Sequence, residues 1–151
     1  MAISAEAVKE LRDKTGVSMM ECKKALEQTD GDIEKALVVL SERALATVGK
    51  KADRTLAAGA VSSYIHNTAQ VGALVTLACE TDFVAKNEEF VALARDIAMH
   101  ATAMRPTDVS ELVAQQFIKD PSKTIADLIS AAVQKFGERI EVVALSVQAT
   151  S

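Results

Sequence analysis

The chain has 151 residues, of which 49% are hydrophobic and 25% charged, and its formal net charge at pH 7 is −4. This composition is that of a globular protein, and no apolar run is long enough to span a bilayer. Because basic residues that contact phosphates supply most nucleic-acid affinity, the negative charge and the lack of a basic stripe argue against direct nucleic-acid binding.

The first residues combine neither a basic segment nor an apolar run, so they predict no secretory signal, and we expect a cytoplasmic protein. The length fits one domain with a small module, or two small domains. Cys22 and Cys79 are far apart in the sequence and lie in apolar surroundings. That setting favours buried thiols over a disulfide, a metal site or a nucleophile.

Three short helices are predicted in the first 45 residues. Ser4, Ser18 and Asp32 each stand where a helix-capping side chain is expected, and Gly16 is a typical left-handed helix end. Ser18 is followed by Glu21, which is the spacing of a capping box. The three helices resemble a module of the ubiquitin-associated type, which is marginally stable by itself and often serves as an interaction surface.

The second of these helices has two faces of different character. Helical spacing places Met19, Cys22 and Leu26 on one apolar stripe, while Met20 falls among charged residues on the polar flank. We therefore expect Met19 in the core of the module and Met20 on its surface.

The apolar stripe of the third helix is lost towards its end, and residues 46–57 are expected to form a linker. This linker separates the N-terminal module, residues 1–45, from a core domain, residues 58–151. The core begins with two runs of alternating apolar residues, 59–66 and 71–79, which predict a β-hairpin.

Two long helices follow the hairpin. The first is predicted over residues 88–104 and ends before Pro106, because a proline disfavours a helical residue in front of it. The second begins at Thr124 and ends at Gly137, and it carries the cleanest apolar stripe in the chain.

Residues 107–121 give the weakest pattern, which fits at most a short helix over 108–116. A last strand is predicted over residues 140–147, where apolar residues occur at both alternating sets of positions. The expected fold class is α+β, in which an N-terminal three-helix bundle is followed by a small three-stranded antiparallel sheet packed with helices.

The junction between the second strand and the first long helix is the most unusual stretch. Asn87 and the two glutamates after it are a typical helix start. Asp82, Phe83 and Val84 are therefore expected just before the helix, on an exposed turn. Phe83 can either fold back onto the sheet or project as a wedge into a partner.

Two motifs at this point resemble one known family. Residues 81–87, Thr-Asp-Phe-Val-Ala-Lys-Asn, look like the signature of the elongation factor Ts family, the nucleotide-exchange factors of elongation factor Tu. Residues 8–12, Val-Lys-Glu-Leu-Arg, followed by Thr15-Gly16 and by residues 19–26, Met-Met-Glu-Cys-Lys-Lys-Ala-Leu, resemble the family's N-terminal module. The two motifs stand in the family's order, and the resemblance covers nearly the whole chain.

The resemblance implies a guanine-nucleotide exchange factor that binds elongation factor Tu with GDP and promotes GDP release by disturbing its magnesium and phosphate site. The first contact would be made by the N-terminal module, through Arg12, Met19 and Met20. The second contact would be made by the turn, through Thr81, Asp82, Phe83 and Val84.

The residues themselves offer little for catalysis, and we expect no enzyme. No glycine-rich phosphate loop is present in the sequence, so no nucleotide or other cofactor is expected. His66, expected at a strand end, and His100, expected on the flank of its helix, have no second ligand at metal-binding spacing. The alternative to an exchange factor is a non-catalytic interaction module or scaffold, which would bind a partner without changing its rate of GDP release.

The resemblance also shows how this chain departs from the family. Long members carry a duplicated core and a helical hairpin, whereas this chain has one core copy, and its stretch between Met104 and Gln116 is shorter than the family pattern. A three-stranded sheet has two open edges and an uncovered face. We therefore expect a homodimer that buries this face.

Overall fold

The computed structural model describes residues 2–151. The chain divides into two compact units, which are described separately below. One unit is formed by the residues up to Ala52 together with Ser130–Gly137, and the other by Asp53–Ile129 together with Glu138–Ser151.

The N-terminal part of the first unit consists of the helices α1 (Ala5–Thr15), α2 (Met19–Gln28) and α3 (Ile33–Lys50). The expected caps are present: Ser4, Ser18 and Asp32 each accept a hydrogen bond from a backbone N–H of the first turn. Gly16 ends α1 with φ of 70°, a conformation that costs glycine little. Helix α3 continues to Lys50, so residues 46–50, which were expected in the linker, are helical.

The core of this bundle contains no aromatic residue, in keeping with the 3% aromatic content of the chain. Its buried residues come from all three helices and from the turn between α1 and α2, and they are Val8, Leu11, Val17, Cys22, Ala25, Leu26, Ala36 and Leu40. The prediction that Met19 belongs to this core was wrong, because 46% of Met19 is exposed. Met19 is the first residue of α2, and the buried face of the helix begins only at Cys22.

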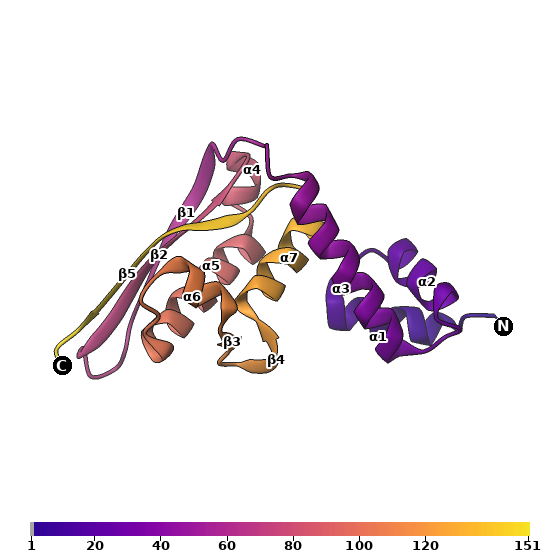
Figure 1. Ribbon diagram of the computed structural model, residues 1–151, viewed down its shortest axis with the longest axis horizontal. Helices are drawn as coiled ribbons and strands as arrows, with labels where there is room; N and C mark the ends of the chain where they lie inside the picture. The colour runs from indigo at the N-terminus through magenta and orange to yellow at the C-terminus, as the bar shows by residue number, and fades with distance from the viewer. Residues whose placement is uncertain (1) are drawn as a thin grey trace. The chain divides into compact units, whose positions relative to one another are not determined.

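The second unit contains an antiparallel sheet of three strands, β1 (Ala58–Ile65), β2 (Val71–Cys79) and β5 (Glu141–Ala149). Their order is β1-β2-β5, so the second strand of the hairpin is central. Figure 1 shows this sheet with helices on one side of it. The α+β prediction, a bundle of helices followed by a three-stranded antiparallel sheet, is confirmed.

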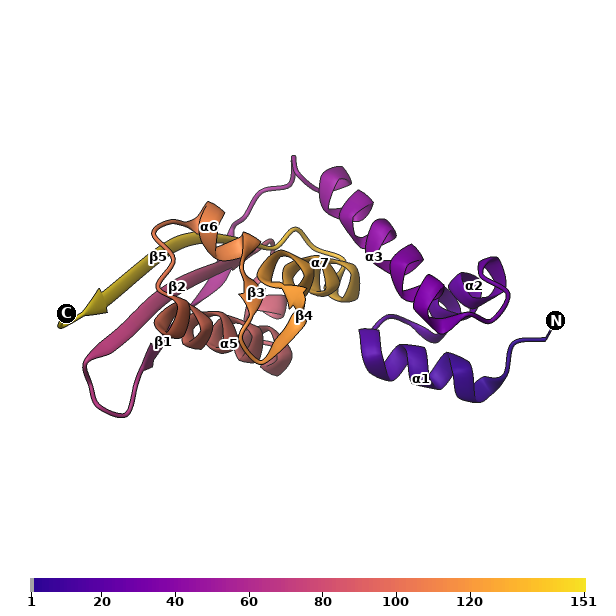
Figure 2. The same cartoon turned by 60° about the horizontal axis from the view of Figure 1, so that its bottom comes forward.

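Helix α5 (Glu88–Met104) packs against β1 and β2, and α6 (Val109–Ala114) packs against β5. Both helices lie on the same side of the sheet in two views (Figures 1 and 2). The hydroxyl of Thr102 in α5 donates a hydrogen bond to the carbonyl of Tyr64 in β1, at 3.3 Å. Between β2 and α5 lies a single helical turn, α4 (Asp82–Ala85).

A second, two-stranded sheet lies in the stretch whose pattern was weakest. Strands β3 (Gln116–Phe117) and β4 (Asp120–Thr124) pair with each other and lead into α7 (Ile125–Phe136). The prediction missed both strands because they are very short. The start of α7 was predicted correctly: Thr124 and Asp127 each accept a hydrogen bond from the other's backbone N–H, at 3.1 and 2.9 Å.

His100, which was expected on the flank of its helix, is completely buried. Its Nδ1 accepts a hydrogen bond from the backbone N–H of Ile118 (3.1 Å), and its Nε2 lies 2.9 Å from Oε1 of Gln115. The histidine thus joins α5 to the start of the two-stranded sheet. Because residues in this sheet were not predicted, this partner could not be predicted either.

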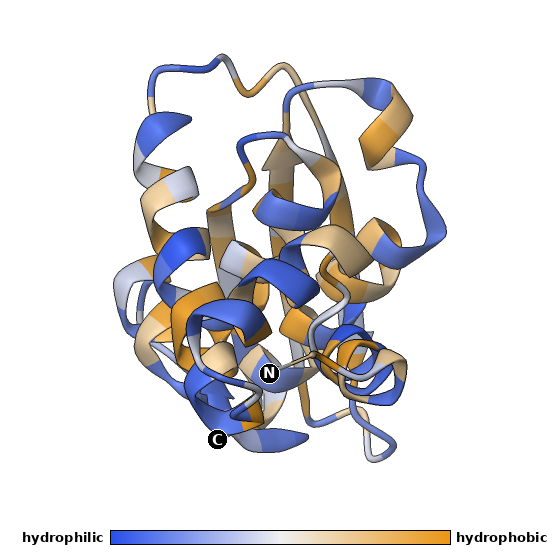
Figure 3. Cartoon of the chain, turned by 90° about the vertical axis from the view of Figure 1, so that its right-hand side faces the viewer, coloured by the Kyte–Doolittle hydropathy of each residue, from blue (hydrophilic) through white to orange (hydrophobic). Residues whose placement is uncertain are grey.

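The three-stranded sheet has one open face. Val61 and Ile65 of β1 and Leu74 of β2 are 68%, 63% and 51% exposed, and the strand register places them on the same side. Figure 3 colours the chain by hydropathy: the loops are mostly hydrophilic, and the helices contain both hydrophilic and hydrophobic residues. The open face is therefore a surface on which apolar side chains remain unpaired within the second unit.

Candidate functional site

The stretch predicted as an exposed turn forms α4. Thr81 is its N-cap, and its hydroxyl accepts a hydrogen bond from the backbone N–H of Val84 at 3.4 Å. Asp82 to Val84 lie before the long helix, as expected, but they form a helical turn rather than an open turn. Asn87 caps the following helix, as predicted, by accepting a hydrogen bond from the N–H of Glu89 at 2.8 Å.

The residues of α4 differ sharply in exposure. Phe83 is 86% exposed, whereas Val84 and Ala85 are 4% and 8% exposed. Helix α4 packs against β1, β2 and α5 through this buried side. Of the two alternatives for Phe83, the structure shows the projecting side chain, and Asp82 is exposed as well. Val84, in contrast, faces the interior and offers no accessible surface in this conformation.

Cys79 lies immediately behind α4, at the end of β2. Its thiol donates a hydrogen bond to the carbonyl of Thr81, at 3.3 Å. Burial raises the pKa of this thiol above its ordinary value, as it does for Cys22. Both cysteines are buried and neither is in a disulfide, so their prediction as core thiols is confirmed.

Two carboxylates hold the start of α4 to a distant segment. One oxygen of Glu138 accepts hydrogen bonds from the backbone N–H groups of Glu80 and Thr81 (both 3.0 Å), and the other oxygen accepts from the Thr81 hydroxyl (2.7 Å). In return, the carboxylate of Glu80 accepts a hydrogen bond from the N–H of Arg139 (2.6 Å). We call these four residues the carboxylate clamp.

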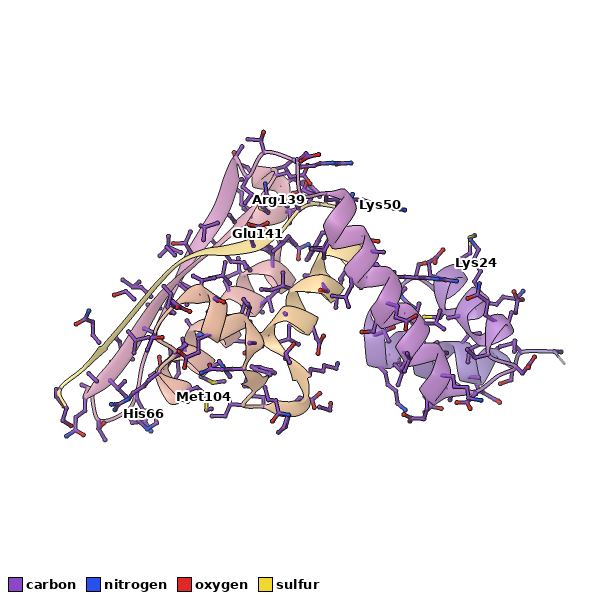
Figure 4. The ribbon with its side chains drawn as sticks, in the orientation of Figure 1. Lys24, Lys50, His66, Met104, Arg139 and Glu141 are labelled. Atoms are coloured by element: carbon purple, nitrogen blue, oxygen red, sulfur yellow. The ribbon has the colours of Figure 1, made fainter. Side chains whose placement is uncertain are left out.

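The side chain of Arg139 extends the clamp to two further segments. Its Nη1 donates to the carbonyl of Arg54 (2.6 Å), and its Nε and Nη2 donate to one oxygen of Glu141 (2.9 and 2.8 Å). Figure 4 labels Arg139 and Glu141 side by side, at the end of the sheet where Figure 1 places α4. Arg54, which lies in the predicted linker, also donates to Glu80 at 3.4 Å.

The other three predicted site residues lie in the first unit. Arg12 is on the last turns of α1, and Met19 and Met20 are the first two residues of α2. All three are exposed, and Met20 is exposed by 67%. They flank the α1–α2 turn in the sequence, and the two neighbouring methionines at the start of α2 are exposed apolar side chains.

Within residues 2–151, the side chains of His, Cys, Asp and Glu form no group that could hold a metal ion. Across the same residues, no helix is both long and apolar enough to cross a membrane.

Comparison with known proteins identifies the family. A family model described as Elongation factor TS matches residues 80–150, which include α4, the carboxylate clamp and β5. Elongation factor Ts of Leptospira biflexa is 41% identical over 187 aligned positions, covering 94% of this chain and 94% of that protein. The chain belongs to the elongation factor Ts family.

Other relatives agree with this assignment. Elongation factor Ts of Desulfotalea psychrophila is 38% identical over 187 positions, covering 94% of this chain and 95% of that protein. Elongation factor Ts of Clostridium botulinum, strain Eklund 17B, is 49% identical over 140 residues, covering 93% of this chain and 46% of that protein. Membership assigns the chain a role in translation elongation.

The relatives also contain residues that this chain lacks. Two of the alignments extend over 187 positions, more than the 151 residues of this chain. The Clostridium botulinum relative is longer still, since this chain covers less than half of it.

Proposed function

We propose that this chain is the guanine-nucleotide exchange factor of elongation factor Tu, as its family membership implies. It has no catalytic site of its own and acts by binding elongation factor Tu with GDP and weakening the hold on GDP. The observation that carries this proposal is the 86% exposure of Phe83 on a helical turn whose other side is buried. An exposed phenyl ring on a firmly packed support is suited to insertion into a partner.

The thermodynamic requirement is simple. If the factor binds nucleotide-free elongation factor Tu more tightly than the GDP-bound form, then it must lower the affinity of elongation factor Tu for GDP by the same ratio. In GTPases of this kind, a magnesium ion bridges phosphate oxygens and protein side chains. We infer that Asp82 and Phe83 enter beside this site and disturb it.

The N-terminal module contributes to binding of elongation factor Tu rather than to the release of GDP. We propose that residues 1–45, a bundle of the ubiquitin-associated type, grip elongation factor Tu through Arg12, Met19 and Met20. Methionine side chains adapt to apolar surfaces, and burial of an apolar side chain contributes roughly 1.5–3 kcal/mol. Residues 46–57 then connect this module to the core domain, residues 58–151.

We further propose that the protein acts as a homodimer in the cytoplasm. The open face of the sheet, with Val61, Ile65 and Leu74 exposed, is suited to meet the same face of a second copy about a two-fold axis. A hollow at the hairpin end of this face is lined by residues of all three strands, among them Ile65 and Leu74. A stable interface should bury at least about 1,000 Å² in total.

The test is release of a fluorescent GDP analogue from elongation factor Tu, with and without this protein. An exchange factor accelerates release, whereas a scaffold binds and leaves the rate unchanged. Repeating the measurement in excess EDTA tests the magnesium step. Without magnesium, the factor should accelerate GDP release much less, because the magnesium coordination that it disturbs is already absent.

A further inference from the structure

The direction in which Phe83 projects depends on what holds α4 in place. On its buried side, α4 is held by packing of Val84 and Ala85. At its start, it is held by Glu138, which follows α7 and is separated from Thr81 by 57 positions in the sequence. A single four-residue turn has little stability of its own, so these tertiary contacts determine its position.

We infer that Glu138 is a positioning residue of the exchange reaction: its carboxylate fixes the start of α4 and thereby the direction in which Phe83 enters the partner. This inference rests on the proposed exchange function. It assigns a role to Glu138, which lies outside both motifs and touches neither Asp82 nor Phe83 through any hydrogen bond described within residues 2–151.

The geometry supports this role because three donors converge on one carboxylate. The two backbone N–H groups fix the peptide before α4, and the hydroxyl fixes the Thr81 side chain. That hydroxyl also accepts the capping hydrogen bond from the N–H of Val84. Hydrogen bonds to an ionised acceptor are roughly twice as strong as neutral ones, so Glu138 orders the first turn through Thr81.

The same contacts change the role of Thr81. Its hydroxyl donates to Glu138 and accepts from Val84, so both of its functions as a hydrogen-bonding group are used within the chain. Thr81 therefore links the clamp to α4, and we assign the contact with the partner chiefly to the exposed side chains of Asp82 and Phe83. Glu80 accepts a hydrogen bond from the N–H of Arg139. The segment before α4 and the segment after α7 therefore each carry a carboxylate that binds the backbone of the other.

The chain offers a matched control for Glu138. Glu111 also accepts hydrogen bonds from the N–H (3.2 Å) and the hydroxyl (2.6 Å) of a threonine, Thr107, before a different helix, α6. Glu111→Ala removes the same type of contact without touching α4. Glu138→Gln is the conservative variant, because the amide oxygen can still accept from the two backbone N–H groups.

The experiment measures the maximal rate of fluorescent GDP release at saturating factor, and the factor concentration that gives half of this rate. Misplacement of a functional side chain by about 1 Å can lower a rate about 100-fold. We therefore expect Glu138→Ala to lower the maximal rate at least about tenfold. Glu138→Gln should be intermediate and Glu111→Ala should equal the wild type. The half-saturating concentration should change little, because the N-terminal contacts remain.

A double-mutant cycle separates positioning from general destabilisation. In the Phe83→Ala background, Glu138→Ala should cause no further loss of rate, since the side chain that it positions is gone. Equal losses in both backgrounds, or a Glu138→Ala protein as fast as the wild type, would overturn the inference.

A second readout does not depend on exchange activity. The sequence contains no tryptophan, so Phe83→Trp introduces a single reporter at the tip of α4. Glu138→Ala and Glu138→Gln should lower its fluorescence anisotropy, whereas Glu111→Ala should not. If the wild-type protein fails to accelerate GDP release, the proposed function is wrong, and unchanged anisotropy in both Glu138 variants would separately overturn the positioning role.

Discussion

Phe83 and Val84 are consecutive residues of one helical turn, and they face opposite ways: Phe83 is 86% exposed and Val84 is 4% exposed. The turn is therefore bare on one side and packed into the core on the other. A side chain that inserts into a partner needs both properties, because an exposed ring on a mobile segment would not keep its orientation on contact with the partner.

The first prediction concerns the stability of the two sides of α4. Val84→Ala should lower the free energy of unfolding by roughly 1–3 kcal/mol, because it removes buried methyl groups and leaves a cavity. Phe83→Ala should change it by less than about 0.5 kcal/mol, as is usual for an exposed position. Urea unfolding of the two variants checks this. A Phe83→Ala protein that loses as much stability as Val84→Ala would mean that the ring packs against the core.

The second prediction concerns the N-terminal module. Arg12→Ala, Met19→Ala and Met20→Ala should each weaken binding to elongation factor Tu with little loss of stability, because all three side chains are exposed. Leu26→Ala is the control for the core: Leu26 is completely buried, and its truncation should cost roughly 2–5 kcal/mol. Titration calorimetry and urea unfolding measure the two effects. Unchanged affinity in the three exposed variants would remove this surface from the interface.

The third prediction concerns His100 and pH. Nδ1 accepts from the N–H of Ile118, so the ring proton is on Nε2, where it can be donated to Gln115. Burial lowers the pKa of His100, and a proton on Nδ1 would also break the hydrogen bond to Ile118. The folded protein therefore holds His100 neutral at pH values where the unfolded chain begins to bind a proton.

The sign of the effect follows from this difference. Below pH of about 6.5, the unfolded chain binds more protons at His100 than the folded chain does, so stability falls as pH falls, by at most about 1.4 kcal/mol per pH unit. Above this pH, His100 is neutral in both states, and its contribution to the free energy of unfolding is fully present. Urea unfolding between pH 7.5 and 5 measures the slope, and His100→Leu should flatten it. Identical slopes for the variant and the wild type would rule out His100 as the cause.

The fourth prediction concerns association through the open face of the sheet. The wild-type protein should have about twice the 16.1 kDa mass of one chain in light scattering at micromolar concentration, with or without reducing agent. Leu74→Glu should give the mass of a single chain, because it places a charge at the centre of the proposed interface. Val38→Glu, at an exposed apolar position of α3, is the control and should leave the mass unchanged. A wild-type protein with the mass of one chain would contradict the dimer.

The sequence allowed the prediction of features that depend on local patterns. The caps at Ser4, Asp32 and Asn87, the end of α1 at Gly16 and the hairpin ending at Cys79 each depend on residues close together in the sequence, where propensity and periodicity are informative. The exposure of Phe83 could be anticipated for the same reason, since the helix start at Asn87 places it just before a new element.

The features that the sequence did not predict depend on tertiary contacts. Glu138 meets Thr81 across 57 positions, and a glutamate after a helix end is ordinarily a solvated charge. The partners of His100, Gln115 and Ile118, flank the unpredicted strand β3. Val84 points inward because α4 is helical rather than an open turn. Met19 was misplaced because its spacing fits the apolar stripe, although the bundle core does not extend to the first turn of α2.

If Phe83 accelerates GDP release, its truncation must lower the maximal release rate at saturating factor, which is measured for the wild type and for Phe83→Ala. Ile118→Ala, which truncates another exposed apolar side chain of the same unit, is the matched control. We expect the wild type and Ile118→Ala to accelerate release equally and Phe83→Ala to be at least about tenfold slower, with its fold intact by circular dichroism. A Phe83→Ala protein with the full rate of the wild type would show that Phe83 does not accelerate GDP release.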